Sequence, residues 1–222
     1  MPASGSVVEC KGILAIWNDM DVEHQDFYEQ WYMNEHFPER LGVPGFRRAR
    51  RYEAVEADRR YFSFYELDSP DVLFSAAYLA RLNAPTAWTL RIMSAFKNNS
   101  RTVCERLERV GRALGGYVAA ARWEEPVAPG PGIAGRIREA LADPSVVAVD
   151  VWRAFERQNV ATQESQKRGV PDRMITAAVV VETTRLANAA RVPKLLPGIL
   201  SDLPAPSSIG LYRLIAIQDS EA

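Results

Sequence analysis

Short apolar runs alternate with amphipathic stretches through the first half of the chain. Residues 12–17 read GILAIW and are followed by the polar pair Asn18-Asp19, which predicts a buried strand that ends in a turn. Over residues 24–41 the aromatic positions recur at three- and four-residue spacing, which predicts an amphipathic helix. Pro38 is expected to break or restart that helix.

The rest of the first half completes one supersecondary unit. The pattern predicts further strands at 46–54, 60–67 and 101–109, and helices at 72–82 and 85–96. In the strand 60–67 the two faces alternate, with Tyr61, Ser63 and Tyr65 on one side and Phe62, Phe64 and Glu66 on the other. The order β-α-β-β-α-β, with an extra short helix before the last strand, is that of a ferredoxin-like unit.

The second half repeats this order. Its predicted strands are at 116–123, 146–155, 175–182 and 211–217. Its predicted helices are at 133–141 and at 186–200, the second of these broken by prolines. We therefore interpret the fold class as α+β, with two tandem ferredoxin-like repeats over residues 1–112 and 113–222. Each sheet would carry helices on one face only, and packing the two open faces together would bury both.

Two charged segments stand out from this pattern. Residues 157–173 are rich in Gln, Lys and Arg, and we expect a long exposed loop or edge flap there. The strand around residue 50 carries a basic run, Arg47, Arg48, Arg50 and Arg51, with Arg59 and Arg60 nearby. This run is expected to be a solvated strand face or an oligomer contact, or else to attract an anionic substrate.

Charge and composition exclude several classes of partner. The formal net charge of -1 removes the simplest argument for nucleic acid, which needs a concentrated excess of Lys and Arg. No apolar run is long enough to cross a bilayer, and the first nine residues lack a basic start and a long apolar core. We expect a cytoplasmic protein with a small-molecule substrate and no membrane partner, either a monomer with an internal pseudo-dimer or a homodimer.

Cysteine and histidine are scarce. Cys10 and Cys104 lie in or beside predicted strands at no metal-binding spacing, and are expected to be free thiols. With only His24 and His36, a site that needs three histidines cannot be built within one chain, so no metal is expected. Nicotinamide, ATP and serine-hydrolase chemistry are also disfavoured, because their glycine-rich and nucleophile-elbow motifs do not occur.

A short motif connects the chain to a known family. The first helix reads FYEQWYMNEHFP over residues 27–38, and VPGF follows at 43–46. Over residues 12–66 the chain resembles the EthD-like branch of the dimeric α/β-barrel superfamily, in which a helix with an aromatic-Trp pattern and a His-x-Pro ending leads into a Pro-Gly turn and the second strand. The resemblance implies an intramolecular dimeric α/β barrel with a ligand cavity between sheet and helices. Since the second half lacks the motif, it also implies a site in the first repeat.

The predicted helix gathers the residues best suited to chemistry. His36 is the leading candidate, because imidazole can give or take a proton near neutral pH. Tyr28, Tyr32 and His36 are spaced by four and share one stripe, with Trp31 and Glu35 on the neighbouring one. A pocket of this kind suits a flat, weakly polar substrate. Equally, the aromatics could be core residues and His36 a satisfied histidine at a helix end.

Other candidates come from the strands. We expect His36, Glu35 and Asp19 to be catalytic, with Asp19 either orienting His36 or capping the following helix. The expected substrate-binding residues are Trp17, Tyr28, Trp31, Tyr32, Tyr61 and Tyr65. Asp150, Trp152 and Glu182 interrupt apolar strands of the second half and are expected to face the cavity shared by the two halves.

Three hypotheses for function follow. The first is a cofactor-independent enzyme that acts on an aromatic or polyketide-like compound by His-based acid/base chemistry, of the lyase or decarboxylase, isomerase or monooxygenase type. The second is a haem protein with His36 as axial ligand, although no Cys-x-x-Cys-His attachment motif occurs. The third is a non-catalytic protein that binds an apolar compound.

Overall fold

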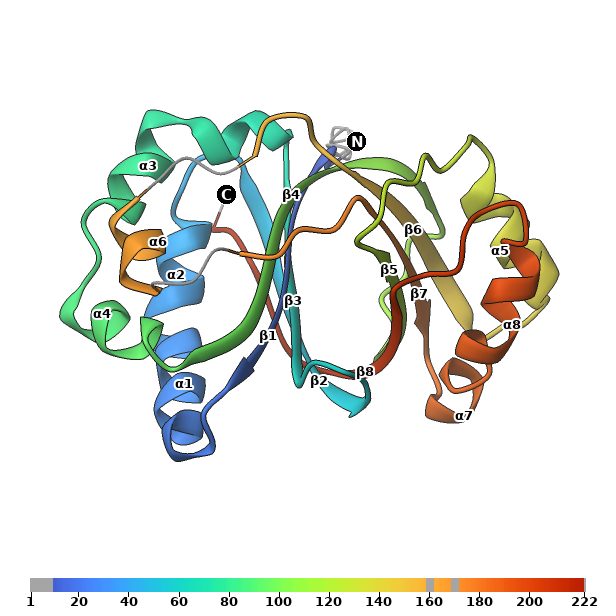
Figure 1. The fold of residues 1–222 in the computed structure, drawn as a ribbon, viewed down its shortest axis with the longest axis horizontal. Coiled ribbons are helices and arrows are strands. Elements are labelled where there is room, and N and C mark those ends of the chain that lie inside the picture. Colours follow the sequence, from blue (N-terminus) through green and yellow to red (C-terminus); the bar gives the residue numbers. More distant parts are fainter. Residues whose placement is uncertain (1–9, 159–161, 169–171, 222) are drawn as a thin grey trace, which may run out of the picture.

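The computed structural model describes residues 10–158, 162–168 and 172–221. In this part of the chain eight strands close into a barrel in the order β1-β3-β2-β8-β5-β7-β6-β4 (Figure 1). The strands are β1 (Gly12–Met20), β2 (Phe46–Glu56), β3 (Tyr61–Leu67), β4 (Phe96–Val110), β5 (Tyr117–Trp123), β6 (Val146–Ala154), β7 (Ala177–Thr183) and β8 (Ser208–Asp219). Neighbouring strands are antiparallel throughout.

Helices cover the barrel on two opposite sides (Figure 1). The helices of the first half are η1 (Val22–His24), α1 (Gln25–Trp31), the π-helix η2 (Tyr32–His36), α2 (Phe37–Leu41), η3 (Pro70–Phe74), α3 (Ala76–Leu82) and α4 (Ala87–Met93). Those of the second half are α5 (Ile133–Leu141), α6 (Gln163–Arg168), α7 (Leu186–Ala189) and α8 (Val192–Ile199). Of these, α6 lies among the helices of the first half (Figure 1).

Both halves arrange their strands in the same way. In each, the fourth strand pairs with the first, the first with the third and the third with the second, giving β4-β1-β3-β2 and β8-β5-β7-β6. The halves are joined where β2 pairs with β8 and β4 with β6. The predicted elements are therefore present in the predicted order, with differences at their ends and one additional helix, α6, in a segment predicted as a loop. For example, β4 begins at Phe96, and the predicted helix 85–96 is correspondingly shorter.

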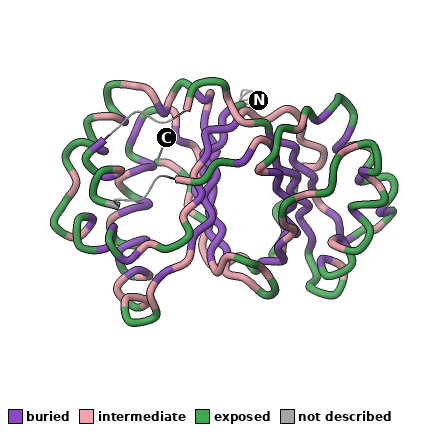
Figure 2. The backbone as a smooth tube through the Cα atoms, viewed as in Figure 1, coloured by how far each residue is buried: buried purple, intermediate pink, exposed green. Residues whose placement is uncertain are grey.

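Alternation along the strands divides the core into a helix side and a barrel side. On β1, Leu14 and Ile16 pack under the first-half helices, whereas Trp17 points into the barrel, where its ring stacks on that of Phe62 with 4.6 Å between ring centres. The barrel interior is filled from both halves, with Trp152 packed against Phe64 at 5.0 Å between ring centres. The expected mutual burial of the two sheet faces is observed (Figure 2).

The expectation of a solvated basic strand is wrong for two of its arginines. Arg50 and Arg51 are 1% and 0% exposed. Because alternate residues of β2 face opposite ways, Arg50 enters the barrel while Arg51 lies under the helices. Arg51 donates to Glu29 at 2.8 Å, and its guanidinium carbon lies 4.4–4.7 Å from the ring centres of three tyrosines, Tyr28, Tyr32 and Tyr61. Carboxylates and aromatic faces replace water around both charges.

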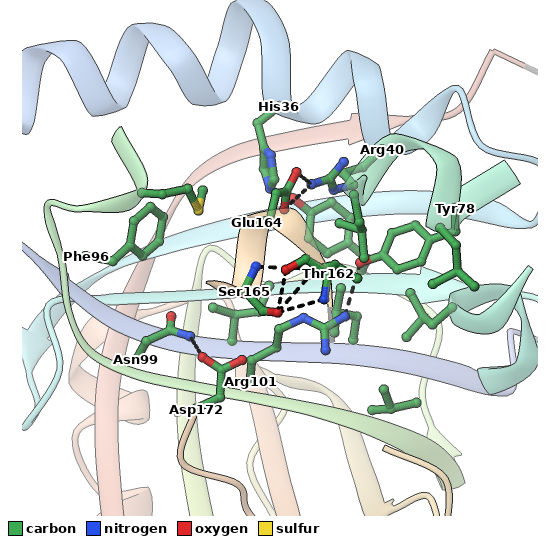
Figure 3. A pocket seen from close by; sticks show the side chains of 18 of the residues that line it. His36, Arg40, Tyr78, Phe96, Asn99, Arg101, Thr162, Glu164, Ser165 and Asp172 are labelled. Carbon is green, nitrogen blue, oxygen red and sulfur yellow. Dashed lines mark hydrogen bonds and ion pairs between the residues drawn. The ribbon is translucent and has the colours of Figure 1, made fainter. Parts of the chain in front are cut away.

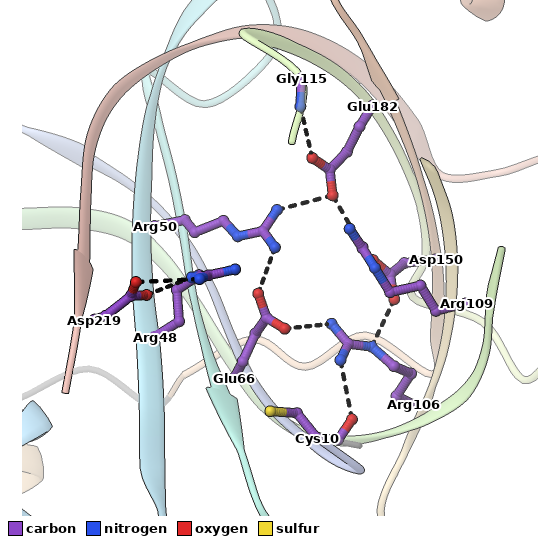
Figure 4. A network of polar contacts seen from close by, with 10 residues as sticks. All are labelled: Cys10, Arg48, Arg50, Glu66, Arg106, Arg109, Gly115, Asp150, Glu182 and Asp219. Atoms are coloured by element: carbon purple, nitrogen blue, oxygen red, sulfur yellow. Dashed lines mark hydrogen bonds and ion pairs between the residues drawn. The ribbon is translucent and has the colours of Figure 1, made fainter. Parts of the chain in front are cut away.

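A closed ring of alternating charges crosses one end of the barrel (Figure 4). Its ion pairs run in the order Arg50, Glu66, Arg106, Asp150, Arg109, Glu182 and back to Arg50. The arginines and Glu66 belong to the first half, whereas Asp150 and Glu182 belong to the second. Asp150 and Glu182 therefore face the barrel interior, as predicted, and the ring joins the two halves electrostatically.

Three structural findings concern membranes, metals and disulfides. Among the described residues, no helix is long and apolar enough to cross a membrane. The same residues contain no group of three or more His, Cys, Asp or Glu side chains that could hold a metal ion. Cys10 and Cys104 form no disulfide, and burial raises the pKa of the Cys104 thiol.

Candidate functional site

A pocket lies between the first-half sheet and the helices that cover it (Figure 3). Its cavity volume is about 60 Å³, below the roughly 300–1,000 Å³ usual for small-molecule sites, so a ring-sized ligand must displace part of the lining. Leu14, Ile16, Tyr65 and Val103 supply the sheet wall. The helices contribute Trp31, Tyr32, His36, Arg40, Tyr78 and Met93, among others.

A π-helical turn places the histidine. The segment Tyr32–His36 is a π-helix, in which residues five apart, and not four, lie over one another. His36 therefore stacks on Trp31, with 4.1 Å between ring centres and 28° between ring planes. The ring of Tyr32 meets His36 edge-on at 5.0 Å. Such turns are frequent at functional sites, and this one delivers an imidazole with a fixed orientation to the pocket wall.

A hydrogen-bond cluster behind the pocket holds Trp31 in place. The indole Nε1 of Trp31 donates to Thr89 Oγ1 at 3.0 Å and to Glu35 Oε1 at 3.2 Å. The same Glu35 oxygen accepts from the hydroxyls of Thr86 and Thr89 at 2.6 and 2.8 Å. Glu35 thus ties the first helix to α4 and fixes the indole on which His36 stacks, while its own side chain does not line the pocket.

Tyr65 presents a phenol on the sheet wall of the pocket. Its side chain is fully buried, and its hydroxyl has no hydrogen-bond partner among the described residues. Burial raises the pKa of Tyr65 well above its ordinary value, so the phenol stays protonated at neutral pH. A buried donor that no described protein group uses is available to an oxygen atom of a ligand.

An ion pair closes the pocket on the side of α6. Arg40 Nη2 donates to both carboxylate oxygens of Glu164, at 2.6 and 2.8 Å, and both side chains are buried (Figure 3). Burial would lower the pKa of Arg40, but the adjacent Glu164 carboxylate raises it above the ordinary value. The segment 157–173 is therefore not simply an exposed loop: α6 packs on the first half. Residues 159–161 and 169–171 lie outside the described part of the chain.

The structure brings together only part of the predicted site. His36, Trp31, Tyr32 and Tyr65 line the pocket. Tyr28 and Tyr61 belong to the same apolar cluster but lie around Arg51, outside the lining. The hydroxyl of Tyr28 is hydrogen-bonded to Asn18.

Trp17 and Asp19 lie elsewhere. Strand alternation sends Trp17 into the barrel, on the opposite face of the sheet from the pocket. Asp19 accepts from the backbone N–H of Arg60 at 2.7 Å and from Asn98 Nδ2 at 2.8 Å, so its carboxylate ties strand ends together and does not reach the pocket lining. The irregular pairing of β1 between Trp17 and Asp19 turns this carboxylate towards β3 and β4.

Sequence reasoning missed four charged residues of the pocket, namely Arg40, Arg101, Glu164 and Asp172. Arg40 follows His36 by four residues, and that spacing alone could have placed it on the same side of the helix. Glu164 has no such signal, because its segment is distant in sequence and reaches the pocket only through the fold. In the second half, the corresponding space under α5 and α8 is occupied by apolar packing that includes Ile137, Leu141, Val192 and Leu196.

Two aromatic side chains pack against the imidazole of His36. Trp31 covers one face of the ring, and Tyr32 meets it edge-on. An axial histidine binds iron through a ring nitrogen and not through a ring face, so the haem hypothesis stays a prediction.

Comparisons with known proteins identify the fold. No family model matches the chain, and no curated protein sequence matches it. Among solved structures, an anthrone oxidase-like protein superposes with a TM-score of 0.60 at 11% identity, covering 96% of this chain and 95% of that one. A putative monooxygenase from Fusobacterium nucleatum gives 0.55 at 9% identity, covering 95% of each chain.

A putative chlorite dismutase gives a TM-score of 0.53 at 14% identity, over 93% of this chain and 95% of the other. The chain therefore shares the overall fold of these structures. The EthD-like resemblance of residues 12–66 stays a prediction. At such low identities the likeness concerns the fold alone, and fold does not choose a reaction.

Proposed function

We propose that the pocket beside His36 is the active site of a cofactor-independent enzyme that oxygenates a planar aromatic or polyketide-like compound. The observation that carries this proposal is the juxtaposition, in one pocket, of an imidazole stacked on Trp31 with the Tyr65 hydroxyl, which has no hydrogen-bond partner among the described residues. The names of two structural neighbours, an anthrone oxidase-like protein and a putative monooxygenase, support the choice of oxygenation over isomerisation or decarboxylation.

The chemistry uses His36 as a base. The imidazole takes a proton from an acidic C–H or phenol of the bound compound, leaving an electron-rich anion delocalised over its rings. Tyr65 donates a hydrogen bond to the oxygen on which negative charge develops, where a preorganised donor in a dry site is most effective. The anion then reacts with O₂. For a ring methylene that becomes a carbonyl, one oxygen atom stays on carbon, and the other leaves as water with the two methylene hydrogens.

The residues around His36 have supporting roles in this proposal. Trp31 and Tyr32 fix the plane of the imidazole, and Glu35 fixes Trp31 from behind. The apolar residues Leu14, Ile16 and Met93 line the space that a flat ring system would occupy.

The proposal also retains the tandem-repeat origin of the chain, with repeats at 1–112 and 113–222. The identical strand order of the two halves supports it. In this view the second repeat lost its own pocket to apolar packing and supplies α6 to the first repeat's pocket.

The test is oxygen consumption with anthrone as the probe substrate, with anthraquinone followed by mass spectrometry. His36→Asn is expected to lower turnover by about 10² to 10⁴-fold, the usual scale of general acid/base catalysis. His24→Asn, which alters the histidine of η1 outside the pocket, is the matched control and should keep the wild-type rate.

A wild-type rate in His36→Asn would overturn the assignment of His36. If the wild type bound anthrone tightly without oxygen uptake, the protein would be a ligand-binding protein and not an enzyme.

A further inference from the structure

The charges in the pocket divide according to the half of the chain that supplies them. The guanidinium groups among the described lining residues come from the first half, on Arg40 and Arg101, together with the imidazole of His36. The carboxylates come from the connection between β6 and β7, on Glu164 and Asp172. The first half alone therefore builds a cationic, aromatic-lined pocket, and the second half supplies its counter-charges.

Glu164 occupies the position at Arg40 where the carboxylate of a ligand would lie. Both its oxygens accept from one nitrogen of Arg40, Nη2, at 2.6 and 2.8 Å. The second terminal nitrogen, Nη1, has Glu39 at 3.4 Å. Arg40 also lies over the ring of Tyr78, with 5.7 Å from the guanidinium carbon to the ring centre. A carboxylate held by a buried arginine beside aromatic rings is the arrangement that recognises an aromatic acid.

Glu164 is held on a short helix whose flanking segments are bonded to β4. On one side, the side-chain amide of Gln158 exchanges hydrogen bonds with the backbone of Val103 at 2.9 and 3.0 Å. On the other, the backbone of Arg173 bonds to that of Asn99 and Arg101 at 3.1 and 3.0 Å. α6 itself donates a long hydrogen bond from Gln163 N–H to Asn83 Oδ1 at 3.3 Å. Among the described residues, the Arg40–Glu164 ion pair joins α6 to the pocket.

We propose that Arg40 is the anion-recognition residue of the pocket, that its ligand is an aromatic carboxylic acid, and that Glu164 is a built-in competitor that holds the subsite when no ligand is bound. This inference rests on the proposed function, because it names the substrate class of the same pocket. Arg40 follows His36 by four residues on consecutive turns, so a ligand anchored by its carboxylate at Arg40 would extend along the side of the helix that carries His36.

Glu164 lowers the affinity of the pocket for carboxylic acids, because it competes with them for Arg40. An incoming carboxylate must replace that of Glu164, because leaving either charge buried and alone is strongly unfavourable. A neutral aromatic compound has no group to offer to Arg40 and leaves the Arg40–Glu164 pair intact. Removing the Glu164 charge should therefore favour acids selectively.

The experiment compares 2-naphthoate with 2-naphthamide by isothermal titration calorimetry at pH 7. Glu164→Gln keeps the size of the side chain and removes the competing charge. We expect it to tighten 2-naphthoate by about tenfold, the scale of one charge-assisted hydrogen bond, and to change 2-naphthamide by less than about twofold. Asp202→Asn, which removes the carboxylate of the exposed Arg136 pair outside the pocket, should leave both affinities unchanged.

Two further variants keep the test decisive. Glu164→Ala removes the same carboxylate and should also tighten 2-naphthoate if Glu164→Gln folds poorly. In the double variant Arg40→Gln with Glu164→Gln, the gain should disappear. The inference would be overturned if the Glu164 variants bound 2-naphthoate and 2-naphthamide more tightly by the same factor, or if neither variant bound 2-naphthoate more tightly. It would also be overturned if neither the wild type nor any variant preferred 2-naphthoate to 2-naphthamide.

The calorimetric result does not depend on turnover, because it measures binding alone. If the oxygen assay showed that His36 is not the base, the preference of the pocket for acids could still be observed. If no preference for acids were observed, the base role of His36 would be unaffected.

Discussion

The imidazole of His36 lies parallel to the indole of Trp31, five residues earlier, with 4.1 Å between ring centres. In an ordinary α-helix two residues five apart point about 140° away from each other around the axis, and the π-helical turn Tyr32–His36 reduces that offset. Trp31 is itself anchored by Thr89 and Glu35. Trp31, held by Thr89 of α4, therefore fixes the orientation of the His36 ring.

Tyr65→Phe separates a ligand-directed role of this phenol from a structural one. Because the hydroxyl is buried without a partner among the described residues, its removal should leave the free energy of unfolding in urea unchanged or slightly higher. Turnover of the anthrone probe should fall by about 10-fold or more, since the developing anion loses a donor.

The matched control for this phenol is Tyr28→Phe. The Tyr28 hydroxyl is hydrogen-bonded to Asn18 outside the pocket, so its loss should cost about 1 kcal/mol of stability with little effect on turnover. The assigned role of Tyr65 would be wrong if Tyr65→Phe lowered stability and left the rate unchanged.

Addition of haemin should give no Soret band that depends on His36. This prediction follows from the proposed function, in which His36 is a base and not an axial ligand. The measurement is the absorption spectrum of wild type and His36→Ala, titrated with haemin. A band that shifts or vanishes in His36→Ala would establish the haem protein instead.

Glu182→Gln should destabilise the barrel. Glu182 is fully buried and bonded to Arg50 and Arg109, so its neutralisation removes one counter-charge from the buried Arg50 and from the partly buried Arg109. The expected loss is about 3–5 kcal/mol in urea unfolding, the range for breaking a buried ion pair. Asp202→Asn breaks an exposed pair with Arg136 and should cost no more than about 1 kcal/mol. Equal effects of the two variants would contradict a stabilising role of the charge ring.

At acidic pH, the free energy of unfolding should depend on the ionisation of Glu66. Burial would raise the pKa of Glu66, but Arg50 and Arg106 hold it below its ordinary value in the folded protein. Such a carboxylate stabilises the fold above its unfolded pKa of about 4.3, and this contribution is lost as the pH falls through the lower, folded pKa.

Urea unfolding from about pH 5 to about pH 3 should therefore show a shallower decline for Glu66→Gln than for wild type. The variant is expected to be less stable at neutral pH, so the slopes are compared and not the absolute values. Parallel profiles would show that Glu66 contributes nothing to the pH dependence.

The sequence alone determined the strand and helix order, because hydrophobic periods of two and of three to four residues are local properties of the chain. It also determined the two-faced strand 60–67: Tyr61 and Tyr65 lie on the helix side and Phe62 and Phe64 inside the barrel, as alternation requires. The motif around Trp31 and His36 indicated a site in the first half, and a pocket lined by both residues lies there.

Only the tertiary structure decided which polar groups meet. Trp17 and Asp19 share the end of β1 with pocket residues, yet strand alternation and an irregular pairing send them elsewhere. The sequence predicted a solvated Arg50, whereas in the fold carboxylates from both halves bind it inside the barrel. Arg40 and Glu164 are 124 residues apart, and no local pattern can encode a contact of that kind. Such contacts depend on barrel closure, which fixes the distance between segments that share no local signal.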